Sequence, residues 1–364
     1  MSRRPAFTGV IVAALVLLAV SGAWSPAATM AELGIAWLWA MGLSLGALLL
    51  DQILLCCGAT WQLPMLRLLE TLHAAVPWLG SAGLVGLAIG SWHGTGQGPS
   101  LAALWLWLRM LGYLSIVALT SGTMRWLSAR GQQTGDARWA RRRRLVGCGS
   151  LLPVALATCI AVMDGYAQCD DFASSIFAPL LVVSGMLSGM AAWTTLVAHR
   201  LGRGLLPIHT DHLVATGRLL LALVIVAAYL AFAQLIICWM GDLPDEAAWY
   251  RPRLHGYLGW FGLVVLLGGY ALPFCALLSH DLKTRPPALA TVCAGILIGQ
   301  FGMLWWTMMP VLRGAGVRLG PEAIVAMILV AGLGGWWCSS AWSLTPPRRT
   351  PELLRALAYR ERLE

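Results

Sequence analysis

Hydrophobic positions fill long stretches of this chain, and charged positions gather between them. Ten stretches are apolar over roughly 20 residues, the length that a helix needs to cross the hydrocarbon core of a bilayer. They lack the alternation of apolar and polar positions typical of membrane barrel strands, and only helices or closed barrels satisfy their backbone in lipid. We therefore predict an all-α, polytopic membrane bundle of about ten transmembrane helices. The predicted spans are 7–24, 33–57, 72–92, 99–127, 145–163, 174–198, 215–239, 256–279, 287–309 and 321–343.

The composition supports a membrane protein and argues against a soluble domain and against several kinds of metal or haem site. Of the 364 residues, 59% are hydrophobic and 11% are charged, whereas soluble domains carry about 25% charged residues. The nine cysteines show no C-x-x-C spacing and no ligand-like spacing to histidine, which argues against zinc sites, c-type haem and iron–sulfur clusters. The seven histidines lie at the ends of spans or in loops, which does not favour a haem held between two facing histidines.

The basic residues predict how the chain is oriented. With the amino terminus in the cytoplasm, 20 of the 25 lysines and arginines fall on the cytoplasmic side, as the positive-inside rule requires. This distribution explains the net charge of +9 better than nucleic-acid binding does. We predict that both termini are cytoplasmic. The first span also fits a secretory signal, because Arg3 and Arg4 precede a modest apolar stretch with small residues, but a retained span is favoured.

The chain is predicted to divide into a membrane domain, 1–344, and a short cytoplasmic tail, 345–364. In the tail, Thr350 can cap a helix that has Pro351 at its first position. Leu353, Leu354 and Leu357 would then form one apolar stripe. We expect this amphipathic tail to lie along the cytoplasmic interface.

Two ionisable residues are predicted well inside the spans, where charge is costly and functional roles are common. Asp51 lies near the cytoplasmic end of the second span and suits either a proton relay or a quinone head group. The alternative is a carboxylate that snorkels to the interface with help from Gln52. Arg109 could bind an anionic or quinoid head group, or snorkel outward beside Trp105 and Trp107. Their depths differ by roughly 15 Å at 1.5 Å per residue, so direct pairing is not expected.

The seventh span and the loop after it carry a specific pattern. It reads Tyr229-Leu-Ala-Phe232-Ala-Gln234, then Cys238-Trp239, Leu243-Pro244-Asp245-Glu246 and Trp249-Tyr250. Its order and spacing resemble the Y-x-x-F-x-Q…I-W-Y…P-E-E…W-Y signature of the ActF-type membrane subunit of alternative complex III, an NrfD-like family. Further similarities lie at Arg67 and Glu70 with Pro77, Asp211-His212-Leu213 with Gly217-Arg218, Pro273-Phe274, and Trp306 with Pro310.

This resemblance implies paired helical bundles in the bacterial inner membrane and a place in a respiratory quinol:cytochrome c oxidoreductase. The implied partners are an NrfD-like sister subunit, a multihaem cytochrome c and an iron–sulfur subunit, or an adjacent oxidase, together with membrane lipid. The redox centres would reside in those partners, so no cofactor is expected on this chain. Quinone is the one ligand that the resemblance leaves open.

Several polar positions of the family pattern are replaced here. Val214 and Ala215 stand where the family has His-Asp, and Gly269 stands where it has the histidine before Pro-Phe. Gln300 and Met303 correspond by spacing to a histidine and an aspartate of the ninth span. A proton path needs titratable groups at relay distances, so a structural or assembly role is favoured over proton conduction.

The candidate site residues follow from the spans and from the resemblance. They are Asp51, Arg67, Glu70 and His212 near the cytoplasmic side, Tyr229 and Gln234 as hydrogen-bonding groups, and Arg109 in the fourth span. Arg67 and Glu70, three residues apart on a helix, could also simply pair with each other. The alternative function is a secondary transporter, which glycine-rich stretches such as 332–335 permit, although no inverted repeat is evident.

Overall fold

A computed structural model describes residues 4–95, 100–167, 174–241, 244–314, 316–340 and 351–359 of the chain. Within these ranges the chain is helical almost throughout and contains no strand. Nine helices of the described part are long and apolar enough to cross a membrane. The expectation of an all-α, multi-pass membrane bundle is therefore confirmed. The predicted span at 72–92 corresponds to α4 (Val76–Thr95), which is not among these nine, so a tenth span stays a prediction.

The elements follow one another along the chain with short connections. They are α1 (Arg4–Trp24), α2 (Pro26–Cys56), η1 (Leu63–Met65), α3 (Leu66–His73), α4 (Val76–Thr95), α5 (Leu101–Thr134), α6 (Ala137–Tyr166), α7 (Phe177–Leu201), α8 (Asp211–Gly241), α9 (Pro244–Leu254), α10 (Gly256–Leu266), η2 (Leu267–Ala271), α11 (Leu272–Leu278), α12 (His280–Thr284), α13 (Pro286–Arg313), α14 (Pro321–Ser340) and α15 (Pro351–Leu357).

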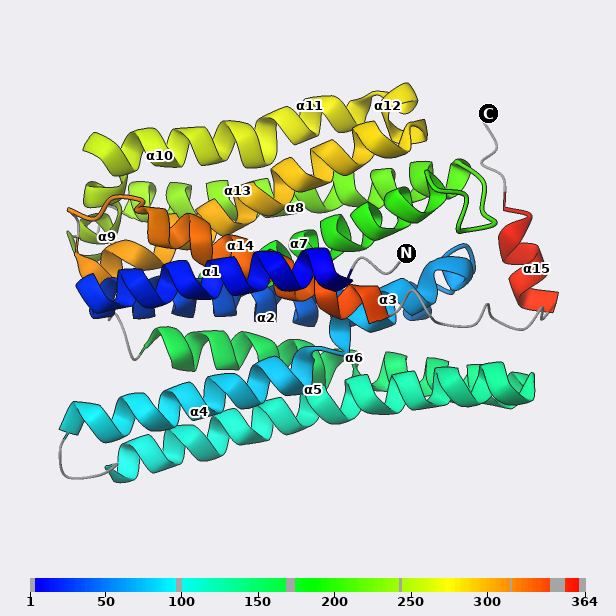
Figure 1. Cartoon of the computed structure of the whole chain (residues 1–364), viewed down its shortest axis with the longest axis horizontal. Coiled ribbons are helices and arrows are strands. Elements are labelled where there is room, and N and C mark those ends of the chain that lie inside the picture. Colours follow the sequence, from blue (N-terminus) through cyan, green and yellow to red (C-terminus); the bar gives the residue numbers. More distant parts are fainter. Residues whose placement is uncertain are drawn as a thin grey trace.

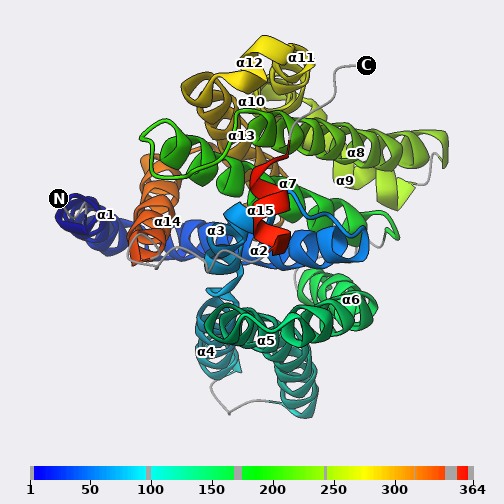
Figure 2. The same ribbon diagram turned by 90° about the vertical axis from the view of Figure 1, so that its right-hand side faces the viewer.

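The long helices lie side by side along the longest axis of the molecule (Figure 1). Helices α2 and α7 occupy the centre, with α8, α10, α11 and α13 on one side and α4, α5 and α6 on the other (Figure 2). Helices α3, α12 and α15 gather at one end of the bundle and α9 lies at the opposite end (Figure 1). We name these the α15 end and the α9 end.

Glycines bring α2 and α7 into direct backbone contact at the centre of the bundle. Gly42 and Gly46 on α2 face Gly185 and Gly189 on α7, each pair spaced four residues apart. A Cβ atom built on Gly46 would lie 2.2 Å from the carbonyl oxygen of Gly185. Small residues at this spacing let membrane helices pack closely, where dispersion rather than the hydrophobic effect drives association. The contact fixes α2, which carries Asp51, against the rest of the bundle.

The arginine-rich stretch is helical rather than a loop between spans. Asp136 caps α6 by accepting a hydrogen bond from the backbone N–H of Arg138 at 2.9 Å. Arginine is a good helix former, so the helix runs through 141–144 before it reaches the apolar segment. Arg143 is buried, whereas Arg142 and Arg144 on either side are exposed. The cytoplasmic placement of this run stays a prediction, while Arg143 turns into the bundle.

The tail helix α15 packs against the α15 end of the bundle. Leu353 and Ala356 are buried, whereas Leu354 is largely exposed. The apolar face of the helix therefore packs against the rest of the bundle, whereas we expected it to lie along the lipid interface. Thr350, the expected cap, lies outside the described residues.

Candidate functional site: a buried charge network

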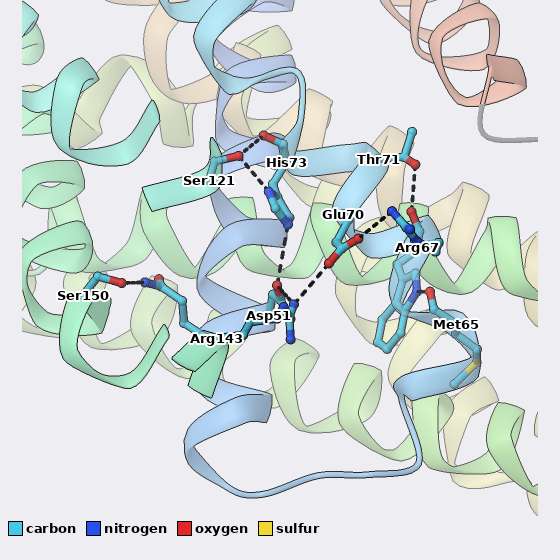
Figure 3. Close-up of polar contacts among 11 residues, drawn as sticks. Asp51, Met65, Arg67, Glu70, Thr71, His73, Ser121, Arg143 and Ser150 are labelled. Carbon is cyan, nitrogen blue, oxygen red and sulfur yellow. Dashed lines mark hydrogen bonds and ion pairs between the residues drawn. The ribbon is translucent and has the colours of Figure 1, made fainter. Parts of the chain in front are cut away.

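Four ionisable side chains from three helices meet near the α15 end. The Arg143 guanidinium on α6 donates to Oδ2 of Asp51 on α2 at 2.5 Å, and the same nitrogen lies 3.5 Å from Oε1 of Glu70 on α3. Nε2 of His73, at the end of α3, lies 3.6 Å from Oδ2 of Asp51. The His73 and Arg143 side chains thus converge on one carboxylate (Figure 3).

The network is shielded from solvent. The exposed fractions are 0% for Asp51, 0% for His73, 3% for Glu70 and 4% for Arg143. At this burial the charges interact through a medium of low dielectric, which strengthens both their attraction and the penalty for leaving any of them unpaired.

Arg67 connects the network to the surface. Its NH1 lies 3.7 Å from Oε2 of Glu70, and its side chain is 30% exposed. Its Nε donates to Oε1 of Gln132 on α5 at 2.9 Å, and its NH2 contacts the same oxygen. The pairing of Arg67 with Glu70 that their spacing suggested is confirmed, and Glu70 is the bridge between Arg67 and the buried Arg143.

Ser121 on α5 sets the orientation of the His73 ring. Its hydroxyl lies 3.0 Å from the backbone carbonyl oxygen of His73 and 2.8 Å from Nδ1 of the same residue, so it contacts both the backbone and the ring. Which partner donates at Nδ1 depends on the tautomer of His73. The other ring nitrogen, Nε2, faces Oδ2 of Asp51 at 3.6 Å.

Several polar atoms of the network have no hydrogen-bond partner among the described residues. They are Oδ1 of Asp51, Oε1 of Gln52, both carboxylate oxygens of Glu70, Nε2 of His73 and Nε of Arg143. Buried polar atoms are normally satisfied. The carboxylate and amide oxygens among these atoms are acceptors, whereas Nε of Arg143 is a donor.

Burial raises the pKa of Glu70 above its ordinary value of 4.5, and the nearby Asp51 carboxylate adds to this shift while Arg143 opposes it. The folded chain then holds this proton more tightly than the unfolded chain. Stability contributed by Glu70 should therefore be present below about pH 4.5 and be lost as the pH rises through the folded pKa.

We expect the variant Glu70→Gln to show a flatter dependence of unfolding free energy on pH than the wild type across this window. Reversible unfolding in mixed micelles at a series of pH values measures it. Asp281→Asn, an exposed carboxylate on α12, is the matched control. Parallel curves for Glu70→Gln and the wild type would contradict the expectation.

Arg109 belongs to a second cluster, toward the α9 end. Its NH2 donates to Oδ1 of Asp164 on α6 at 2.6 Å and its Nε donates to the Tyr113 hydroxyl at 3.2 Å. Tyr113 in turn donates to Oδ2 of Asp164 at 2.9 Å. Arg109 and Asp51 thus each have their own partner, in agreement with the expected difference in depth. Asp164 thus supplies a counter-charge for Arg109.

The remaining candidates lie apart from the buried network. His212 is buried, and its Nε2 lies 3.0 Å from the carbonyl oxygen of Ala356, so it holds α15 against the bundle. Gln234 is buried and accepts from the Ser174 hydroxyl at 2.5 Å. Tyr229 is 66% exposed on the outer surface of α8. Of the seven candidates, the fold brings together Asp51, Arg67 and Glu70.

The segment after the seventh span forms a helix, α9, that is anchored by aromatic packing. The Arg253 guanidinium lies 3.6 Å from the ring centroid of Trp249 and donates to the Thr307 carbonyl at 2.8 Å. The Trp249 indole donates to the Tyr166 hydroxyl at 2.7 Å. The acidic turn before these aromatics includes 242–243, which lie outside the described residues. The aromatic part of the pattern thus attaches α9 to the bundle.

His73, Arg143 and Ser121 were missing from the candidates. A run of four arginines on one helix must turn at least one toward the core, because successive residues are rotated by about 100°. That periodicity could have indicated Arg143. His73 was placed at the end of a span, and only the packing of α3 on α5 reveals its partners.

The fold and this network define a multi-pass helical membrane protein with a buried charge cluster near one end. Among the described residues, no group of three or more histidine, cysteine, aspartate or glutamate side chains is placed to hold a metal ion. No protein-family model and no curated protein matches the chain. The resemblance to the ActF-type family therefore rests on the residue pattern alone.

Proposed function

We propose that this chain is an integral membrane subunit of a respiratory quinol:cytochrome c oxidoreductase of the alternative complex III type in the bacterial inner membrane. Its main role is to form the packed membrane scaffold of the complex. Its buried network exchanges protons near the cytoplasmic face, which the distribution of arginines assigns to the α15 end. The chain itself carries no redox centre, and its partners are a sister membrane subunit, a multihaem cytochrome c and an iron–sulfur subunit.

One observation carries the proton-exchange part of the proposal. Asp51 and the Nε2 of His73 face each other at 3.6 Å inside the bundle, with the His73 ring fixed by Ser121. A buried ion pair contributes little net stability compared with apolar residues of similar volume. Its presence in a membrane helix is better explained by function. The replacements at Val214 and Ala215 in α8 and at Gln300 and Met303 in α13 remove titratable groups of the family pattern from those helices, but they do not involve this network.

The route from the network to the surface supports the same role. Glu70 lies between the buried Arg143 and the half-exposed Arg67, which reaches Gln132 at the end of α5. A proton that enters beside Arg67 therefore meets Glu70 first and the Asp51–His73 pair next. Glu70 suits this position, since its raised pKa lets it carry a proton where an exposed carboxylate would not.

Gentle solubilisation and mass spectrometry of the co-purified proteins test the assignment to a complex. We expect a multihaem cytochrome c and an iron–sulfur subunit to accompany the chain. Isolation of the chain alone from a membrane that retains quinol oxidation would overturn the assignment.

The variant Asp51→Asn tests proton exchange in the intact complex. We expect assembly to persist and the number of protons moved per quinol oxidised to fall, because an amide cannot take up the proton. Asp281→Asn on α12 is the control and should leave the proton yield unchanged. An Asp51→Asn complex with the wild-type proton yield would remove Asp51 from the mechanism.

A secondary transporter is the second candidate, and one observation favours it. Residues Leu267–Ala271 form a π-helical turn in the middle of the span that begins at α10. Here the Tyr270 hydroxyl lies 3.5 Å from Oε1 of the buried Gln300. Interrupted helices with buried polar groups are typical of transporter binding sites. A purified chain that is thermally stabilised by one class of solute, with no co-purifying redox subunit, would favour this function.

A further inference from the structure

Helix α2 carries a second buried carboxylate at the other end of the bundle. Glu32 lies in the second turn of α2, near the α9 end, and its side chain is 1% exposed. The sequence offered no reason to select it, because the second span was predicted to begin at residue 33. The helix in fact begins at Pro26, so Glu32 lies within the helix and faces the bundle.

One indole is the hydrogen-bond donor to this carboxylate among the described residues. Nε1 of Trp305 on α13 lies 3.1 Å from each of the two carboxylate oxygens. Trp305 itself belongs to an apolar cluster that includes Ile35, Ala36 and Met309. A single neutral donor shared between two oxygens is a weak partner for a full negative charge.

Charged groups lie around Glu32 but form no ion pair with it in the described part of the chain. Arg313, at the end of α13, and Glu322, at the start of α14, act on it electrostatically with opposite signs. The Glu322 carboxylate accepts from the Ser21 hydroxyl on α1 at 3.1 Å. Asp51, by contrast, has a guanidinium nitrogen at 2.5 Å. Asp51 therefore has a cation in contact, whereas Glu32 has none among the described residues.

We propose that Glu32 is a proton-binding site of the α9-end half of the membrane domain and is a neutral carboxylic acid in the resting protein. Desolvation of an unpaired charge is far more costly than that of a neutral acid. A neutral acid keeps the Trp305 bond through its carbonyl oxygen. The burial of Glu32 and its single neutral donor do not depend on whether the chain belongs to a respiratory complex.

Infrared spectroscopy of the full chain in lipid nanodiscs near neutral pH tests this protonation state. The difference spectrum between the wild type and Glu32→Gln is the informative measurement. We expect the variant to lose the C=O stretching band of a protonated carboxyl group. Loss of the two carboxylate stretching bands in its place would overturn the proposal, as would a difference spectrum with no change in the carboxyl region.

Two further variants separate the site from general effects. Glu32→Asp should keep a protonated carboxyl band at a shifted frequency, which shows that the signal follows the residue. Trp305→Phe removes the only donor to the carboxylate in the described chain and should move the pH at which the band disappears to a higher value. A shift to a lower pH would contradict the pocket described here. Asp51→Asn, which alters proton yield if the proposed function is correct, should leave the Glu32 band in place.

Discussion

Replacing Arg143 with methionine is expected to destabilise the folded chain by about 3–5 kcal/mol, the largest effect that we predict for a single substitution. The variant removes the guanidinium that lies 2.5 Å from Oδ2 of Asp51 and 3.5 Å from Oε1 of Glu70. It leaves the buried Asp51 carboxylate without an arginine in contact, and it leaves Glu70 with Arg67 as its only arginine partner among the described residues, at 3.7 Å. Methionine retains much of the volume of arginine. The loss of stability is therefore due to the missing positive charge and not to a new cavity. Reversible unfolding in mixed micelles measures it.

The neighbouring arginines provide a matched control. Arg141 lies on the exposed face of the same helix, and Arg141→Met should change the unfolding free energy by no more than about 0.5 kcal/mol. The double variant Asp51→Asn, Arg143→Met should recover part of the loss, because it removes one of the stranded charges. Equal destabilisation by Arg143→Met and Arg141→Met would show that the buried network is not formed in the membrane.

The class of fold could be predicted from the sequence because it depends on one property, the length of the apolar stretches. The ends of the helices could not be placed equally well, and two residues of the proposed sites were missed for that reason. Glu32 lies one residue before the predicted second span, and Arg143 lies two residues before the predicted fifth span. In both places the helix extends past the apolar stretch. A helix ends where its backbone hydrogen bonds end, and this position need not coincide with the change in hydropathy.

The partners within the site could not be predicted from the sequence for a different reason. Asp51 and Arg143 are 92 residues apart, and only the packing of α6 against α2 joins them. Arg67 and Glu70 share one helical turn, so their spacing alone was sufficient. Arg109 and its partner Asp164 are 55 residues apart, on α5 and α6. Local pairs are therefore readable from a single sequence, whereas cross-helix pairs depend on the tertiary fold.

Substituting alanine for Gly46 is expected to destabilise the chain by about 1–3 kcal/mol. The new Cβ atom would lie 2.2 Å from the carbonyl oxygen of Gly185 and 2.3 Å from its carbonyl carbon. These are backbone atoms of a buried helix, so no side chain can rotate away and α2 and α7 must separate. Separation also moves Asp51, one turn and a half further along α2, relative to its partners on α3 and α6. The unfolding free energy in mixed micelles is again the measurement.

Intrinsic helix propensity predicts the opposite sign, which makes the comparison decisive. Alanine is favoured over glycine by about 1 kcal/mol within a helix. Gly34 lies on the same helix, and a Cβ atom there would meet nothing within 4 Å, so Gly34→Ala should be neutral or slightly stabilising. If Gly46→Ala matched Gly34→Ala, the central crossing of the bundle would be looser than the structure shows. A clear difference between them would establish that the close approach of α2 and α7 stabilises the bundle.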